Sequence, residues 1–291
     1  YYDNFVKGDS TYFVWLNRGK ESLIADIKNS KDQKFLKKMI LKSDIFIQNL
    51  LPGTLEKYGL DSKFLRKKNK KLITCDISGY GSDGANSKTK AYDLLIQAET
   101  GLCSLTGDER NPGRVGVSVC DIACGLNAYT LILEALLERE QTGVGASIKI
   151  SLFDSLSEWM NVPYLQYVYT KQAPKRVGLA HPSIVPYGCF VAKDNTNILF
   201  SIQNEREWVS FEENILKLPE ELKKKFINPS QRLKYKIKLN KLIDKAFKLL
   251  TSKKITYYFK KGNIAYGFLN NIKDFAKHTE LKTSHLTTAH G

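Results

Sequence analysis

Apolar residues in the first half of the chain fall into short β-like runs separated by helical patterns. The runs over 44–49 (DIFIQN), 72–78 (LITCDIS) and 147–153 (SIKISLF) combine β-branched and other apolar residues, as strands do. Segment 31–42, before the first run, and segment 93–105, between the second and the third, are typical of helices. Strands that alternate with helices at such spacings favour right-handed βαβ crossovers, so we expect an α/β fold with a mostly parallel, Rossmann-like sheet and flanking helices.

Three further segments complete the pattern before residue 170. Residues 12–28 indicate two β-like runs around a turn at 17–19, and residues 54–72 indicate one or two short helices. A helix is also expected near 154–168. Ligands of parallel sheets bind beyond the carboxyl ends of the strands. The loops after Gln48, after Ile77 and before Asp121 are therefore the places where we expect a site.

The chain changes in character after Lys171. A segment rich in Pro and Gly is followed by a predicted strand over 197–204, a helix over 205–216 and a Lys-rich helical region over 219–277. The expected organisation is a large α/β domain over 1–170, a linker or substrate-side loop over 171–189, a small α/β domain over 190–277 and an incomplete return segment over 278–291.

Asp121 stands out because it lies between a short β-like run and a long amphipathic helix. Apolar residues recur from there at the spacing of one buried helical face, namely Ile122, Leu126, Tyr129, Leu133, Leu136 and Leu137. Aspartate is a preferred N-cap, and the helix start favours its ionised form. Carboxylates also act as nucleophiles that form covalent acyl intermediates. Position alone favours capping over catalysis.

The composition narrows the classes of protein. The 291 residues include 42% apolar residues, and we expect no membrane span, because no window approaches the required apolar length. No signal-peptide pattern is present and the first residue is not Met, so we expect a fragment lacking both ends. The net charge is +15, with lysine runs over 63–71 and 222–226. Solvated helix faces explain these runs better than a nucleic-acid partner, and no nucleic-acid motif accompanies them.

Cysteine usage and phosphate-binding motifs exclude other classes. Five cysteines, an odd number, lie at 75, 103, 120, 124 and 189 without a CxxC motif. This arrangement argues against a disulfide framework or a metal site and favours a reducing, cytoplasmic compartment. The chain contains no GxGxxG or Walker A motif, so a nicotinamide or nucleoside triphosphate site has no support.

Several motifs, in order, carry a specific resemblance that covers nearly the whole chain. They are FVKGDSTYFVWLNRGKESLIADIK, DIFIQNLLPGTLEKYGLD, ITCDISGYG, KAYDLLIQAETGLCSLTG, the segment around Asp121, and AHPSIVPYG. The chain resembles the family III CoA-transferases (the CaiB/BaiF family, which includes formyl-CoA transferase and carnitine CoA-transferase). The resemblance implies that fold, an interlocked homodimer, and coenzyme A or acyl-CoA as substrate without a metal. It implies transfer of CoA from an acyl-CoA such as succinyl-CoA to a small, dicarboxylic acid.

The resemblance also assigns roles to particular residues. Asp121 matches the family's nucleophile, which forms an aspartyl anhydride and then an aspartyl-CoA thioester, and Tyr92 is the candidate donor to a developing oxyanion. The implied CoA-binding residues are Ala25, Asp26, Ile27, Lys28, Asn49, Leu50, Leu51, Lys57, Lys90, Ala91, Tyr92 and Asp93. Lys28 and Lys57 suit CoA phosphates as point charges, although each is also an ordinary surface lysine. His181 matches the substrate-side loop, or is a surface loop residue.

Alternative functions stay open at this point. The racemase branch of the same superfamily has a histidine where this chain has Tyr92. Tyrosine is a poor base at neutral pH because its pKa is about 10, which favours transfer over racemisation. A basic nucleic-acid-binding protein and a catalytically inactive remnant are the other two alternatives.

Overall fold

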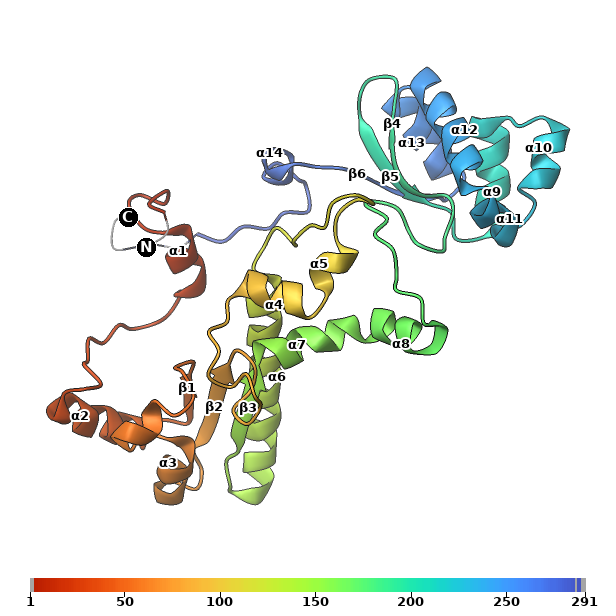
Figure 1. Cartoon of the computed structure of the whole chain (residues 1–291). Helices are drawn as coiled ribbons and strands as arrows, with labels where there is room; N and C mark the ends of the chain where they lie inside the picture. Colours follow the sequence, from red (N-terminus) through yellow and green to blue (C-terminus); the bar gives the residue numbers. More distant parts are fainter. Residues whose placement is uncertain (1–2, 286, 289–291) are drawn as a thin grey trace. The chain divides into compact units, whose positions relative to one another are not determined.

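A computed structural model describes residues 3–285 and 287–288, and the chain divides into two compact units (Figure 1). One unit comprises Leu23–Gly178, and the other comprises Tyr1–Ser22 together with Leu179–Gly291. The domain boundaries expected at 170 and 190 stay a prediction, and residues 286 and 289–291 of the expected return segment lie outside the described residues.

The first unit is built on a parallel sheet of three strands. They are β1 (Ile45–Gln48), β2 (Ile73–Ser78) and β3 (Ser147–Ser151), in the order β1-β2-β3. The register pairs Ile47 with Cys75, and Cys75 in turn with Ile148. The three strands expected from the apolar runs are confirmed, and so is their parallel arrangement.

One face of this sheet is covered by α6 (Val119–Thr142), which lies alongside β2 and β3 (Figure 1). The helix contacts the sheet through small residues such as Cys124, Ala128 and Ala135, which pack on Ile73 and Ile148. Small side chains let the helix lie close to the strands, and this packing decides which face is buried.

The buried face that the sequence predicted for α6 is wrong. Leu126, Tyr129 and Leu137 are 59%, 61% and 70% exposed in the described chain. By length and composition, α6 also qualifies as a membrane span, which corrects the expectation that no window reaches that apolar length. These criteria are weak evidence for a span, because the core helices of soluble proteins also meet them.

The opposite face of the sheet packs against the helices before and between β1 and β2. These are α2 (Ser30–Ile40), the 3₁₀ helix η1 (Leu55–Tyr58) and α3 (Ser62–Lys68). Leu65 and Leu72 are fully buried in the cluster that these elements form, and Phe46 of β1 packs against it. Because alternate side chains of a strand point to opposite faces, Phe46 faces away from the α6 cluster that Ile45 joins.

Four shorter helices complete the first unit, with one more 3₁₀ turn. They are α4 (Asp93–Glu99), α5 (Leu102–Leu105), α7 (Leu152–Ser157), η2 (Glu158–Met160) and α8 (Asn161–Thr170). The single helix expected over 93–105 is two helices, because Gly101 takes a left-handed conformation (φ 84°) between them. Ile96, Cys120 and Leu156 are fully buried where α4, α6 and α7 meet.

The β-like runs expected within 12–28 and before Asp121 are not strands in the described structure. Residues 11–16 form the helix α1 (Thr11–Leu16), and the described residues 17–29 belong to no regular element. The turn expected within 17–19 is present at residues 18–19. The β-like run before Asp121 is a loop in the described structure. The strand preference of a residue reflects how its side chain packs on a pleated sheet. These apolar segments have no neighbouring strand to pair with in the described structure, so their sequence alone does not make them strands.

The second unit contains an antiparallel sheet made of β4 (Tyr187–Val191), β5 (Asn197–Ser201) and β6 (Ala265–Phe268). Besides α1, its helices are α9 (Glu205–Phe211), the π-helical turn η3 (Glu212–Leu216), α10 (Glu220–Lys225), α11 (Pro229–Lys234), α12 (Lys236–Leu249), α13 (Ser252–Lys261) and α14 (Ile272–Phe275). The core is aromatic: Phe200 packs against Phe211, Phe247 and Phe259. This unit is mixed α/β and has its own core, and the small domain expected over 190–277 stays a prediction.

Candidate active site

A pocket of about 580 Å³ lies at the carboxyl ends of β1 and β2, beside the start of α6. It is formed by the loop after β1, the loop after β2 as far as Asp93 at the start of α4, the first turns of α6, and Leu152 at the start of α7. The first two are places where the sequence predicted a site; the third predicted place, the loop before Asp121, gives no lining residue, and Asp121, Cys124 and Gly125 of α6 line the pocket instead. The candidate residues that line this pocket are Asn49, Leu50, Leu51, Lys90, Ala91, Tyr92, Asp93 and Asp121.

Asp121 is the third residue of α6, so the expectation that it caps the helix is wrong. The N-cap position belongs to Ser118, and Asp121 lies in the first turn with its side chain exposed. The positive end of the helix dipole favours its ionised form. The pKa of Asp121 is nevertheless raised, first because neighbouring protein atoms displace water and second because of the negative charge of Asp93. Its carboxylate therefore faces the pocket with more basic character than an ordinary aspartate.

A second carboxylate performs the capping that Asp121 does not. Asp93 Oδ1 accepts the backbone N–H of Cys120, in the first turn of α6, at 2.9 Å. Asp93 Oδ2 accepts from the side-chain amide of Gln97 at 2.7 Å. Gln97 Oε1 in turn accepts the backbone N–H of Val115 at 3.0 Å. Both oxygens of Asp93 are thus bound within the protein, although the residue lines the pocket.

The stretch that ends in Asp93 runs along the pocket wall. Tyr92 occupies the N-cap position of α4 and is 68% exposed, so it is not a buried core aromatic. Asp93 follows it as the first residue within α4. Gly79 lies against this stretch: a Cβ on Gly79 would come within 2.4 Å of Ala91 Cβ. The absence of a side chain at Gly79 is therefore required for the position of Ala91 and its neighbours.

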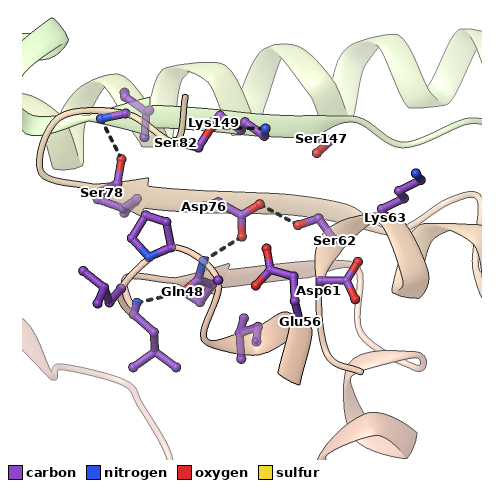
Figure 2. Close-up of a pocket in the computed structure, with 18 of the residues that line it drawn as sticks. Gln48, Glu56, Asp61, Ser62, Lys63, Asp76, Ser78, Ser82, Ser147 and Lys149 are labelled. Atoms are coloured by element: carbon purple, nitrogen blue, oxygen red, sulfur yellow. Dashed lines mark hydrogen bonds between the residues drawn. The ribbon is translucent and has the colours of Figure 1, made fainter. Parts of the chain in front are cut away.

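Figure 2 shows a second pocket, of about 550 Å³. It shares Leu50, Leu51, Pro52, Ile77 and Ser78 with the first pocket. Asp76 lies at its centre. Asp76 Oδ1 accepts from Gln48 Nε2 at 2.8 Å, and Asp76 Oδ2 accepts from the Ser62 hydroxyl at 2.6 Å (Figure 2).

Gln48 connects this network to the candidate site. Its Oε1 accepts the backbone N–H of Leu50 at 2.7 Å, which holds the beginning of the loop over 49–52. Sequence reasoning missed Gln48, Ser62, Asp76 and Gln97 as residues that support the pocket. A signal was available for Asp76, a carboxylate near the end of a buried strand, where a polar side chain points toward ligand loops.

Other candidate residues lie away from the lining of the first pocket. Ala25, Asp26 and Lys28 are exposed, in the stretch before α2, and Ile27 is half-buried against the α2–α3 cluster. Lys57 is exposed on η1. The structure therefore brings Asn49–Leu51 and Lys90–Asp93 together with Asp121, and it leaves the other five outside the residues that line this pocket.

His181 belongs to the other unit and organises its own loop. Its Nδ1 accepts the backbone N–H groups of Ser183 at 3.2 Å and Ile184 at 3.0 Å. Its ring stacks on Tyr187 with the centroids 5.3 Å apart. These contacts explain a histidine at this position without a ligand, and the expected substrate-side role stays a prediction.

The thiols beside Asp121 are buried, and the potential metal ligands of the described residues do not gather in groups of three. The five cysteines are free thiols, and Cys120 and Cys124 are buried beside Asp121. Burial, followed by the nearby negative charges, raises the pKa of Cys120 to about 12, and burial also raises the pKa of Cys124. Within the described residues, no group of three or more His, Cys, Asp and Glu side chains could hold a metal ion.

Comparison with known proteins identifies the family. The model of the family described as "CoA-transferase family III" matches residues 1–290. The chain belongs to CoA-transferase family III. It is 34% identical over 272 residues to the mouse (Mus musculus) succinyl-CoA:glutarate CoA-transferase, which corresponds to 93% of this chain and 62% of that protein. It is 34% identical over 200 residues to the acetyl-CoA:oxalate CoA-transferase of Acetobacter aceti, or 68% of this chain and 51% of that protein.

Solved structures agree with this assignment. A CaiB/BaiF family protein from Brucella suis superposes with a TM-score of 0.81 at 30% sequence identity, covering 92% of this chain and 71% of the other. The fold class expected from the sequence is thereby confirmed. The chain of this family III member spans 62% of the length of the mouse relative.

Proposed function

We propose that this protein transfers coenzyme A between two carboxylic acids, with Asp121 as the covalent carrier. The observation that carries the proposal is the position of Asp121: an ionisable carboxylate on the first turn of a helix, facing a pocket of about 580 Å³ formed by the strand-end loops. The names of the relatives, which transfer CoA between acids such as succinate and glutarate, support the reaction class.

The reaction begins when an Asp121 oxygen attacks the carbonyl carbon of the acyl-CoA thioester. The C–S bond breaks, CoA leaves as a thiolate, and a mixed anhydride joins the acyl group to Asp121. The thiolate then attacks the Asp121 carbonyl carbon, which releases the donor acid as a carboxylate and leaves an aspartyl-CoA thioester.

The second half of the reaction repeats these steps with the acceptor acid. The acceptor carboxylate attacks the aspartyl-CoA thioester and expels the CoA thiolate, which forms a second mixed anhydride. The thiolate attacks the acceptor's carbonyl carbon, so the new acyl-CoA leaves and the Asp121 carboxylate is regenerated. No ATP is consumed, because one thioester is exchanged for another.

The pocket residues suit these steps. The raised pKa of Asp121 makes its carboxylate more basic and therefore a better nucleophile than an ordinary aspartate. Tyr92, exposed at the pocket wall, is our candidate donor to the oxyanion that forms at the attacked carbonyl. Lys90 lines the same pocket and adds a positive charge for an anionic substrate. The acceptor class that we propose is a small dicarboxylic acid, on the basis of the glutarate-using relatives.

The first experiment measures CoA exchange with the 291-residue chain. Succinyl-CoA is mixed with an isotopically labelled dicarboxylic acid, and labelled acyl-CoA is followed by mass spectrometry. We expect transfer with the unaltered chain and none with Asp121→Asn. Asp244→Asn, which changes an exposed helical aspartate in the other unit, is the matched control and retains transfer.

A negative result has a clear meaning. Absence of labelled acyl-CoA with the unaltered chain, or unchanged transfer by Asp121→Asn, would contradict the proposal. Incubation of an α-chiral acyl-CoA in D₂O tests the racemase alternative, since incorporation of deuterium at the α-carbon without CoA transfer favours that reaction instead.

We also propose a homodimer, which covers apolar helix surfaces of the first unit. On α6, Leu126, Tyr129 and Leu137 are more than half exposed, and on α8 Val162 and Tyr169 are 76% and 84% exposed. Exposed apolar residues that gather on helix faces are typical of protein interfaces. Sedimentation velocity should give the mass of two chains, and Leu137→Asp should shift the mass toward one chain, whereas the neighbouring Glu140→Ala should not. A single-chain mass for the unaltered protein would contradict the proposal.

A further inference from the structure

We infer that Gln97 is a positioning residue, which fixes Asp121 by holding the carboxylate of Asp93 against the first turn of α6. The inference rests on the proposed function, because it assigns Asp121 the central chemical role. According to this inference, the reaction also depends on a buried amide, that of Gln97, which does not line the pocket.

Gln97 has no exposed surface, yet it is a polar residue on a helix of seven residues. A buried amide has a large cost unless its donor and acceptor are both bound. Both are bound here, to Asp93 and to the backbone of Val115, at 2.7 Å and 3.0 Å. The amide therefore joins α4 to the loop that leads into α6.

The same chain of hydrogen bonds ends next to the proposed nucleophile. The first N–H groups of a helix have no partner within the helix, and they need an acceptor from elsewhere. The Ser118 side chain at the N-cap makes no capping hydrogen bond to any described residue, and Asp93 supplies the acceptor to Cys120 instead. Asp121 is the next residue. Gln97, Asp93, Cys120 and Asp121 therefore form a continuous connection from a buried amide to the pocket.

Without Gln97, the Asp93 carboxylate loses the donor that sets its rotation, and the Val115 N–H loses its acceptor. The loop before α6 and the first turn of α6 would then no longer be held in one arrangement. A displacement of about 1 Å at a reacting group is enough to lower a rate by roughly 100-fold. The expected consequence is a loss of turnover with little change in CoA affinity, because Gln97 is not in the pocket.

The polarity of the Gln97–Asp93 contact permits a specific test in the 291-residue chain. Gln97→Glu places a carboxylate against the Asp93 carboxylate, and Asp93→Asn places an amide donor against the Gln97 donor. Each single change opposes two like groups. The combined variant reverses the direction of this hydrogen bond, because the new amide at position 93 donates to the new carboxylate at position 97. The carboxylate at position 97 still accepts from the Val115 N–H. The new side-chain oxygen at position 93 still accepts from the Cys120 N–H.

We expect Gln97→Glu to lower kcat for CoA transfer by about 10- to 100-fold with KM for acyl-CoA within about twofold of the original. The D93N/Q97E variant should recover most of the lost kcat, which residues acting independently would not do. A Gln97→Glu chain with unchanged kcat, or a double variant no better than either single variant, would overturn the inference. If Gln97→Glu does not fold, recovery of folding and turnover in the double variant supports the inference, and failure of both overturns it.

Hydrogen–deuterium exchange separates this inference from the proposed function, because it needs no catalytic activity. Peptides that contain residues 115–122 should exchange faster in Gln97→Glu and return to the original protection in the double variant. Equal exchange in all variants would overturn the inference even if the chain transfers CoA. If the chain does not transfer CoA, but exchange protection is lost in Gln97→Glu and recovered in the double variant, the role of Gln97 is supported and the proposed CoA transfer is rejected.

Discussion

The contact between Gly79 and Ala91 allows a prediction whose size follows from the geometry. Gly79→Ala would place a Cβ 2.4 Å from Ala91 Cβ. Nonbonded carbon atoms are stable at about 3.5–4.0 Å, so the two backbone segments must separate by more than about 1 Å. Overpacking of this kind costs about 1–3 kcal/mol. This cost lowers the folding equilibrium constant by roughly 5- to 150-fold.

The same displacement reaches the candidate site, because Ala91 lies between Lys90 and Tyr92 on the pocket wall. We expect Gly79→Ala to lower both the urea midpoint, followed by circular dichroism, and the affinity for CoA, measured by calorimetry. Adding Ala91→Gly removes the opposing methyl group and should restore CoA affinity. Gly84→Ala is the matched control, since its new Cβ would lie 3.9 Å from the nearest heavy atom, the Tyr80 carbonyl oxygen.

The reasoning would be refuted if Gly79→Ala matched Gly84→Ala in stability and CoA affinity. It would also be refuted if Ala91→Gly gave no recovery of CoA affinity in the Gly79→Ala background. Either result would mean that the two segments separate at no cost, and the close approach at Gly79 would then have no role in positioning the pocket wall.

The remaining predictions concern ionisation, packing and thiol reactivity. The pKa of Asp121 is raised in the folded state, so folding disfavours its ionised form. Asp121→Asn should therefore raise Tm near pH 7, and this gain should vanish below about pH 3.9, where aspartate is protonated in the unfolded chain as well. A lower Tm near pH 7 would contradict this. Leu65 is fully buried, so Leu65→Ala should lower the free energy of unfolding by about 2–5 kcal/mol in denaturant titrations, and a loss below about 1 kcal/mol would contradict the packing. Cys120 is buried and its pKa is about 12, so iodoacetamide near pH 7 should leave it unmodified. The partly exposed Cys103 should be labelled under the same conditions. Preferential labelling of Cys120 would refute its assignment as an inert thiol.

The parallel sheet was predictable because its strands are short apolar runs at regular spacings. β2, for example, lies within the expected run over 72–78, and two of its residues are fully buried apolar side chains. Residues 12–16 carry an equally β-like pattern, with Tyr12 and Trp15 among them, and they form a helix. The difference is tertiary: β2 has strands on both sides, and the helix α1 pairs with none.

The helix that carries Asp121 shows which information a sequence pattern lacks. Periodicity correctly predicted a long helix, but it selected the face of large residues, including Leu126 and Leu137, as buried. The sheet instead packs against the face of small residues such as Ala128, because close approach of the helix depends on side-chain volume. An amphipathic pattern identifies apolar positions and cannot by itself identify which neighbour covers them.

Some residues of the candidate site could be predicted from the sequence, and others could not. The family motifs brought Asp121, Tyr92 and Asn49 together, and these residues line one pocket. The supporting role of Gln97 was not predictable, because it acts through hydrogen bonds to Asp93 and to the backbone of Val115, and through Asp93 on the backbone of Cys120. No spacing rule relates a glutamine on one helix to the N-terminus of another.

The central claim is that Asp121 carries the acyl group and then CoA as covalent adducts. The most direct measurement is mass spectrometry of the 291-residue chain after incubation with succinyl-CoA and trapping with hydroxylamine, which converts activated aspartyl groups into hydroxamates. We predict a hydroxamate on the peptide that contains Asp121, dependent on succinyl-CoA and absent from Asp121→Asn. An unmodified Asp121 peptide while CoA transfer proceeds would contradict the account.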